Sequence, residues 1–202
     1  NPAEFFQRYI VKRYATREII QATLKTLKGN ELILLGNHWP SRSAGQYESE
    51  PFRIIAAETL SYFAEQIQKI KGNDAAIIAM GDFNDEPFNR ALSDYALSAR
   101  SRNKVIYAQG PYFFNLMWPL MGKRISSYVF DGHPLMIDQF MVSKGIAQKS
   151  GKYSLDENAV NIESYPGMTS GRYNAPVRFG QKDPNLAGFS DHLPISFQLT
   201  EK

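Results

Sequence analysis

An uninterrupted apolar run at residues 75–80 (Ala-Ala-Ile-Ile-Ala-Met) constrains the fold of this chain most tightly. A short strand that is apolar on both sides is typical of the buried strands of α/β sheets. The preceding residues carry apolar side chains at helical spacing, which predicts a long helix that begins near Ser49 and ends at Gly72. The stripe expected to be buried on this helix is Phe52, Ile55, Ala56, Leu60, Phe63, Ile67 and Ile70.

Weaker patterns on either side extend this alternation of strands and helices. A hairpin is expected from residues 17–27 and 31–38. Further expected elements are a short helix at 89–99, a hairpin made of 126–130 and 136–143, and a last strand at 193–199. Residues 151–188 are rich in Gly, Pro and Asn and are expected to form a long irregular excursion, of a kind that is usually functional or mobile.

Composition bounds the class of protein rather than its function. With 202 residues and no linker-like segment, the chain is expected to form a single domain over 1–202. No run reaches the roughly 18 apolar residues that a membrane helix needs, and the lack of cysteine excludes disulfides and thiolate metal sites. The net charge of +3 is compatible with a polyanionic partner, but an ordinary, slightly basic surface explains it equally well.

Polar side chains gather where the strand-like runs end or begin. They lie in residues 36–42 (Gly-Asn-His-Trp-Pro-Ser-Arg), 81–85 (Gly-Asp-Phe-Asn-Asp), 137–140 (Ile-Asp-Gln-Phe) and 190–194 (Ser-Asp-His-Leu-Pro). Strand ends commonly carry functional groups, because the strand fixes the direction of a side chain while the loop side stays open to a ligand. These segments are therefore the candidates for a functional site.

Asp82 and Asn84 follow the buried strand and are two residues apart. In an extended segment this spacing directs both side chains to the same side. A carboxylate and a carboxamide placed in this way can hold a water molecule and a phosphate oxygen. The alternative is an ordinary turn, since Gly, Asp and Asn are the commonest turn residues.

Asp138 lies within an apolar stretch, where a carboxylate must be paired or solvated. His192 is its natural partner, because an aspartate that holds a histidine ring fixes the tautomer of that ring. Adjacent strand residues face opposite ways, so Asp191 can reach a metal ion while His192 turns toward Asp138. The alternatives are a strand-end aspartate that faces water and a surface Asp-His pair.

His38 ends the strand at 31–38 and is followed four residues later by Arg42, whose guanidinium suits bidentate binding of phosphate. Asn37 and Arg42 are therefore expected to bind substrate beside His38. A lone histidine is more often a structural hydrogen-bonding residue, and this alternative stays open for His38. His133 lies in a turn-like Asp-Gly-His-Pro segment and is expected at the surface.

Together and in this order, the polar segments resemble the signature of the endonuclease/exonuclease/phosphatase superfamily, whose members are similar to pancreatic deoxyribonuclease. The Asn-His-Trp-Pro-Ser-Arg form is also similar to that of a group of uncharacterised bacterial members. The resemblance covers about residues 16–200. It implies a four-layer α/β sandwich in which two β-sheets pack face to face with helices outside.

The resemblance also implies roles for the residues in these segments. His192 resembles the active histidine, with Asp138 as the residue that orients it. Asp82 and Asn84 resemble the pair that positions the attacking water and the phosphate. His38 resembles the second histidine that several branches carry.

The cofactor implied by the resemblance is Mg²⁺ or Mn²⁺, with Asp191 as one ligand. Members hold this ion mainly through a glutamate in an N-terminal stretch, and nothing in residues 1–20 resembles that stretch. Glu4 does not follow a buried strand. The chain is therefore expected to be the C-terminal two-thirds of a full member and to bind Mg²⁺ weakly, because a lone carboxylate is a poor site for this ion.

The function implied is metal-dependent hydrolysis of phosphoester bonds by in-line attack of water, on nucleic acid or on a smaller phosphoester. A nucleic-acid substrate is favoured if residues 151–188 form a basic groove; the candidates there are Arg172, Arg178 and Lys182, interleaved with Tyr173 and Phe179. An ordinary solvated loop is the favoured alternative for that segment. The alternative functions are a non-catalytic binding domain that keeps the fold and an inactive fragment.

Overall fold

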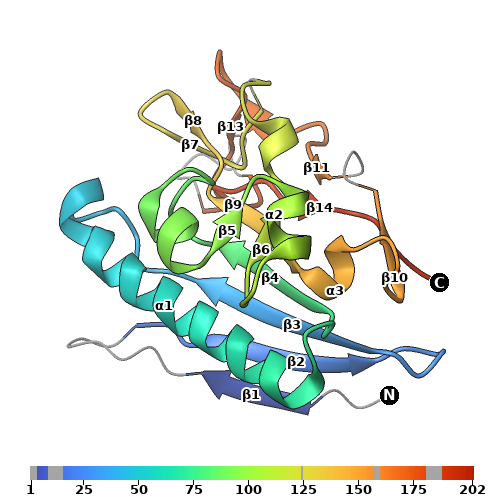
Figure 1. The fold of residues 1–202 in the computed structure, drawn as a ribbon. Helices are drawn as coiled ribbons and strands as arrows, with labels where there is room; N and C mark the ends of the chain where they lie inside the picture. The colour runs from blue at the N-terminus through green and yellow to red at the C-terminus, as the bar shows by residue number, and fades with distance from the viewer. Residues whose placement is uncertain (1–3, 9–15, 124, 157–159, 181–187) are drawn as a thin grey trace.

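The computed structural model describes residues 4–8, 16–123, 125–156, 160–180 and 188–202, and these are built around one mixed sheet of seven strands (Figure 1). In spatial order the strands are β1 (Glu4–Arg8), β2 (Ile19–Lys25), β3 (Glu31–His38), β4 (Ile77–Asp82), β9 (Asp138–Ser143), β6 (Phe113–Asn115) and β5 (Ser98–Ala99). Strand β3 runs parallel to β4, and β9 runs antiparallel to β4. The long connection between β3 and β4 is the helix α1 (Gln46–Lys71), which lies across one face of the sheet (Figure 1).

The remaining helices are short, and four two-stranded ladders complete the described structure. The helices are a π-helix at Ala91–Tyr95, α2 (Arg102–Tyr107), a 3₁₀ turn at Trp118–Leu120 and α3 (Lys144–Ala147). The ladders are β7 (Tyr128–Phe130) with β8 (His133–Leu135), β10 (Tyr153–Leu155) with β15 (Leu199–Glu201), β11 (Asn161–Ile162) with β14 (Ile195–Ser196), and β12 (Thr169–Ser170) with β13 (Ala175–Pro176). None of the helices described here has the length and apolarity needed to cross a bilayer.

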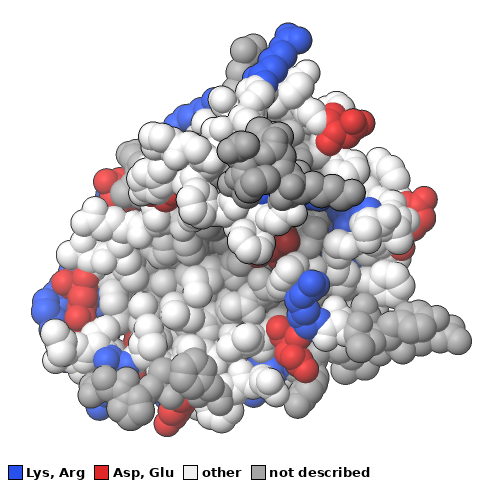
Figure 2. Space-filling model, turned by 180° about the vertical axis from the view of Figure 1, so that it is seen from behind, with Lys and Arg blue, Asp and Glu red and all other residues white. Residues whose placement is uncertain are grey.

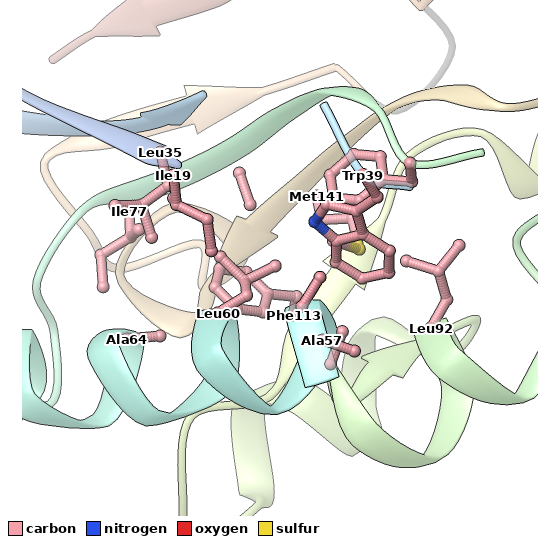
Figure 3. Packing of buried hydrophobic residues seen from close by; sticks show 14 of the residues in the cluster. Ile19, Leu35, Trp39, Ala57, Leu60, Ala64, Ile77, Leu92, Phe113 and Met141 are labelled. Carbon is pink, nitrogen blue, oxygen red and sulfur yellow. The ribbon is translucent and has the colours of Figure 1, made fainter. Parts of the chain in front are cut away.

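The main core lies between α1 and the sheet (Figure 3). Alternate residues of the strands, such as Leu35 and Ile77, point toward α1 and meet Leu60 on that helix. The other alternate residues, such as Ile78 and Val142, belong to a second cluster on the opposite face. Both faces of β4 are therefore buried, as its uninterrupted apolar sequence predicts.

The face of α1 that is buried differs from the expected stripe. The buried residues are Ser49, Arg53, Ala56, Ala57, Leu60, Ala64, Ile67 and Gln68, whereas Ile70 is 78% exposed. Small residues let the helix approach the sheet closely, so the buried face is centred on the alanines rather than on the largest side chains. The helix also begins at Gln46, earlier than expected, and includes Pro51.

The hairpin expected from 126–130 and 136–143 is wrong. Strand β7 pairs instead with β8, through a turn in which Asp131 and Gly132 have φ values of 48° and 74°. Strand β9 lies between β4 and β6, because its apolar sequence is buried on both sides there.

Two smaller expectations also differ from the structure. The helix expected at 89–99 is a single π-helical turn followed by β5, and the last strand is divided into β14 and β15. The hairpin of β2 and β3 is confirmed. The α/β class is also confirmed, as one mixed sheet with helices.

Candidate active site

Three of the predicted residues form a row across neighbouring strands. The strand register pairs His38 with Asp82 and Asp82 with Asp138. Side chains alternate along a strand, so this row lies on the same face as Met80 and Phe140, away from α1. His38 Nε2 lies 3.5 Å from Asp82 Oδ2, which makes Asp82 the centre of the row.

Asp82 and Asn84 come together through a turn rather than through an extended segment. Strand β4 ends at Asp82, and Asn84 has a left-handed φ of 50°. The Asn84 backbone N–H donates to Asp82 Oδ1 at 2.8 Å, and the Asn84 amide donates to Asp82 Oδ2 at 3.1 Å. The Asn84 amide also donates to the Trp39 carbonyl, so its orientation is fixed from both sides.

His192 is held against Asp138 as predicted. Its Nδ1 lies 2.7 Å from Asp138 Oδ2, in a half-buried setting. The ring of Tyr128 stacks on the imidazole, with centroids 4.6 Å apart and planes inclined by 28°. The neighbouring Ser127 accepts from the Asp138 backbone N–H through Oγ and from the Leu193 N–H through its carbonyl, so one segment braces both partners.

The charges in this row shift two pKa values. Burial and the nearby Asp138 carboxylate raise the pKa of Asp82 above its usual value, although the Asn84 hydrogen bond and the two histidines oppose the rise. Burial alone would lower the pKa of His192. The hydrogen bond and charge of Asp138, with the Asp82 and Asp191 carboxylates, outweigh burial and raise that pKa. The closely spaced carboxylates therefore raise the proton affinity of His192.

Asp191 stands apart from this row in its contacts. Its Oδ2 lies 3.3 Å from an Arg178 guanidinium nitrogen, and the Asp191 side chain is 46% exposed. Nowhere in the described residues do three or more His, Cys, Asp or Glu side chains gather as a metal-binding group. Mg²⁺ requires near-octahedral oxygen coordination, and the donors described here do not complete it. The metal role of Asp191 therefore stays a prediction.

Asn37 and Arg42 are engaged by other protein groups. The Asn37 amide is buried, accepts from Trp39 Nε1 at 3.0 Å and donates to the Leu35 carbonyl. Arg42 Nε donates to the Asn84 carbonyl at 2.6 Å. Their substrate-binding roles stay predictions.

A hollow of about 780 Å³ opens beside the row. Asn37, His38, Asp138 and His192 line one part of it, and apolar side chains such as Phe140 and Ile195 line another. Seen from behind, the middle of the molecule is covered mainly by uncharged residues, with both signs of charge scattered around it (Figure 2). The described part of this face has no broad basic patch.

Several residues around the site were not predicted. Tyr128 and Ser127 had no sequence signal, because their role depends on the bridge between Tyr128 and His192. Asp85 offered a signal, because it directly follows Asn84, whereas the burial of Arg53 on α1 depends on its contact with Asp85 and had no local signal. His133 is exposed, as expected. Of the basic residues proposed for a groove, Arg172 and Arg178 are exposed, and Lys182 lies outside the described residues.

Comparisons with solved structures show the same fold at low identity. The chain is similar to the catalytic domain of human Nocturnin with bound sulfate (16% identity, TM-score 0.54, 100% of this chain and 59% of that chain). It is also similar to humanised D. rerio TDP2 (15%, 0.59, 98% and 66%) and to SmcL (16%, 0.54, 96% and 64%). The chain thus spans about 60% of the length of these structures.

Sequence comparison gives the family directly. A search of curated proteins found no match. The model of the Endonuclease/Exonuclease/phosphatase family matches residues 7–201, nearly the whole chain. The chain therefore belongs to the endonuclease/exonuclease/phosphatase family.

Proposed function

We propose that this chain carries most of the active site of a hydrolase of phosphoester bonds. Members of its family are metal-dependent phosphoester hydrolases. The observation that carries the proposal is that Asp82, paired with Asn84, lies on the strand next to Asp138, paired with His192, beside a hollow that Asp138 and His192 line.

In the proposed reaction a water oxygen attacks phosphorus in line, and the P–O bond opposite it breaks, so that the leaving oxygen departs with the bonding electron pair and takes up a proton. Asp82 and Asn84 hold this water and a phosphate oxygen, because a carboxylate accepts from the water while an amide donates to the phosphate. Asp138 accepts from Nδ1 of His192, which leaves Nε2 to carry a proton toward or away from the substrate. Either Asp82 or His192 is the base, and His38 and His192 can stabilise negative charge on the phosphoryl oxygens when protonated.

Mg²⁺ is the ion that the family typically uses. We propose Asp191 as one of its carboxylate ligands in this protein. The described donors do not complete a site for it.

The single domain over 1–202 and the four-layer sandwich belong to the same proposal. The ladders β10–β15 and β11–β14 lie beside the second apolar cluster, on the sheet face away from α1. We propose that they are parts of the second sheet.

Mutation of the two central residues tests the activity. In the gene product that contains this chain, His192→Ala and Asp82→Ala are each expected to abolish Mg²⁺-dependent hydrolysis of bis(p-nitrophenyl) phosphate, since removal of one such group typically costs about 10²–10³ in rate. The exposed His133→Ala serves as the matched control and is expected to retain activity. Wild-type rates in either site variant would reject the assignment. An inactive wild-type protein that still binds phosphoesters would favour the non-catalytic alternative.

The substrate is either a small phosphoester or a nucleic acid. Single-stranded DNA is the product seen in a complex of D. rerio TDP2. Plasmid nicking measured beside release from small mono- and diesters separates the two. Steep inhibition by salt would support the polymer.

A further inference from the structure

The loop that carries Asp82 and Asn84 is tied to a buried carboxylate, Asp85. Asp85 is 1% exposed, and its Oδ1 lies 2.9 Å from Arg53 Nε and 3.2 Å from Arg42 Nη2. A charge removed from water in this way must be paired. The two arginines supply that pairing from different elements of the fold.

Arg53 anchors this carboxylate to the start of α1. Its side chain is 1% exposed. Nη1 donates to Ser49 Oγ and Nη2 donates to the Gln46 carbonyl, both at 2.7 Å. Both Nη atoms are thus hydrogen-bonded within the protein, Nε is held to Asp85 by the ion pair alone, and burial keeps the guanidinium out of reach of a ligand.

Arg42 joins Asp85 to the backbone of the catalytic loop. Besides its contact to the Asn84 carbonyl, it donates through Nη2 to Asn89 Oδ1 at 3.0 Å. Gln139, the neighbour of Asp138 on β9, donates to the Asp85 carbonyl at 2.6 Å. The loop is therefore held from the β3–α1 connection, from α1 and from β9.

This bracing explains how Asn84 keeps its left-handed backbone. Asparagine tolerates the left-handed region better than most residues, and hydrogen bonds from its surroundings further stabilise Asn84 at φ 50°. Arg42 donates a hydrogen bond to the Asn84 carbonyl, and the Asn84 backbone N–H donates to Asp82 Oδ1. Loss of the Arg42 hydrogen bond is therefore expected to let the loop relax and to move the Asn84 side-chain amide away from Asp82.

We propose that Arg42, Arg53 and Asp85 form a positioning network that sets the geometry of Asp82 and Asn84, and that Arg42 acts through this network instead of binding phosphate. The catalytic consequence rests on the proposed function. The positioning itself does not depend on the proposed function, because it is a structural property of the loop.

The test replaces Arg42 by lysine, which keeps the charge but cannot reach all three acceptors. Hydrogen exchange of the Asn84 backbone N–H is expected to become about tenfold faster in Arg42→Lys, because the loop loses the local restraint of one hydrogen bond. Arg90→Lys is the matched control, because Arg90 is 60% exposed and contacts Tyr95 and Asp94, outside the network. Asn89→Ala removes one acceptor of Arg42 and is expected to give a smaller acceleration, which keeps the test usable if Arg42→Lys does not fold.

Kinetics distinguish positioning from substrate binding. For an active gene product, Arg42→Lys is expected to lower kcat about tenfold or more with KM nearly unchanged. A raised KM with unchanged kcat and unchanged exchange at Asn84 would overturn the proposal in favour of a phosphate contact. If the wild-type protein hydrolyses no phosphoester, the proposed function fails, yet faster exchange at Asn84 still supports the network and unchanged exchange still refutes it.

Discussion

His192 illustrates how neighbours set the charge of a single residue. Its imidazole is half-buried, which favours the neutral form, yet Asp138 at 2.7 Å favours the cation more strongly. Tyr128 covers one face of the ring and limits its rotation. The residue therefore combines a fixed orientation with a raised proton affinity.

The pKa of His192 is predicted to be raised by its neighbours. An NMR titration is expected to give a value above the ordinary 6.5, and Asp138→Asn is expected to lower it. Because the folded pKa is raised, the stability that this histidine contributes is fully present below pH 6.5 and is lost as the pH rises through the folded pKa. A pKa that does not change in Asp138→Asn would contradict the pairing.

The buried Arg53–Asp85 pair is predicted to stabilise the fold. Arg53→Met is expected to lower the free energy of unfolding by about 3–5 kcal/mol, because it leaves Asp85 charged and poorly paired in the interior. Arg53→Met combined with Asp85→Leu is expected to recover much of this loss. Urea denaturation measures both, with Arg90→Met as the exposed control. A double variant no more stable than Arg53→Met alone would argue against an electrostatic origin.

Strands β3 and β4 approach each other closely at Gly81, one residue before the end of β4. Gly81 has φ 128°, and a Cβ there would lie 2.0 Å from the Asn37 carbonyl oxygen. This approach places His38 next to Asp82. Only a glycine satisfies both the backbone angle and the contact.

A pair of glycine variants separates the effect of the backbone angle from the effect of the close contact. Gly72→Ala, at φ 97° with no heavy atom within 4 Å of the added Cβ, carries backbone strain alone, of about 1–3 kcal/mol. Gly81→Ala carries strain and a clash, so its thermal midpoint is expected to fall further than that of Gly72→Ala. Equal losses would mean that β3 and β4 can separate without cost.

Sequence patterns predicted the elements that have a strong local signal. They failed for features that depend on which distant strand or charged residue becomes the partner. The run at 75–80 and the β2–β3 hairpin were predicted, because composition and a tight turn define them locally. The partner of β7 was not predicted, because β9 pairs with β4 and β6 inside the main sheet and leaves β8 to pair with β7. The same holds for Arg53, whose burial is acceptable only because Asp85 lies opposite.

Over the whole molecule, the candidate site is assembled from segments as distant in sequence as residues 38 and 192. The described residues do not supply enough ligands for a metal ion at this site. Isothermal titration calorimetry of the 202-residue chain with Mg²⁺ is therefore expected to show weak binding that does not reach saturation. The competing contact of Arg178 with Asp191 adds to this expectation. Tight, stoichiometric binding would show that the donors assemble on their own.

The sequence by itself determined the α/β class, the family and the polar residues at the strand ends, because these depend on local apolar patterns and short motifs. Only the tertiary structure decided that His38, Asp82 and Asp138 share one row, that Asn84 meets Asp82 through a left-handed turn, and that Arg42 faces protein acceptors. The physical reason is that strand register and the pairing of buried charges are settled between segments far apart in the chain, where no local pattern specifies the partner.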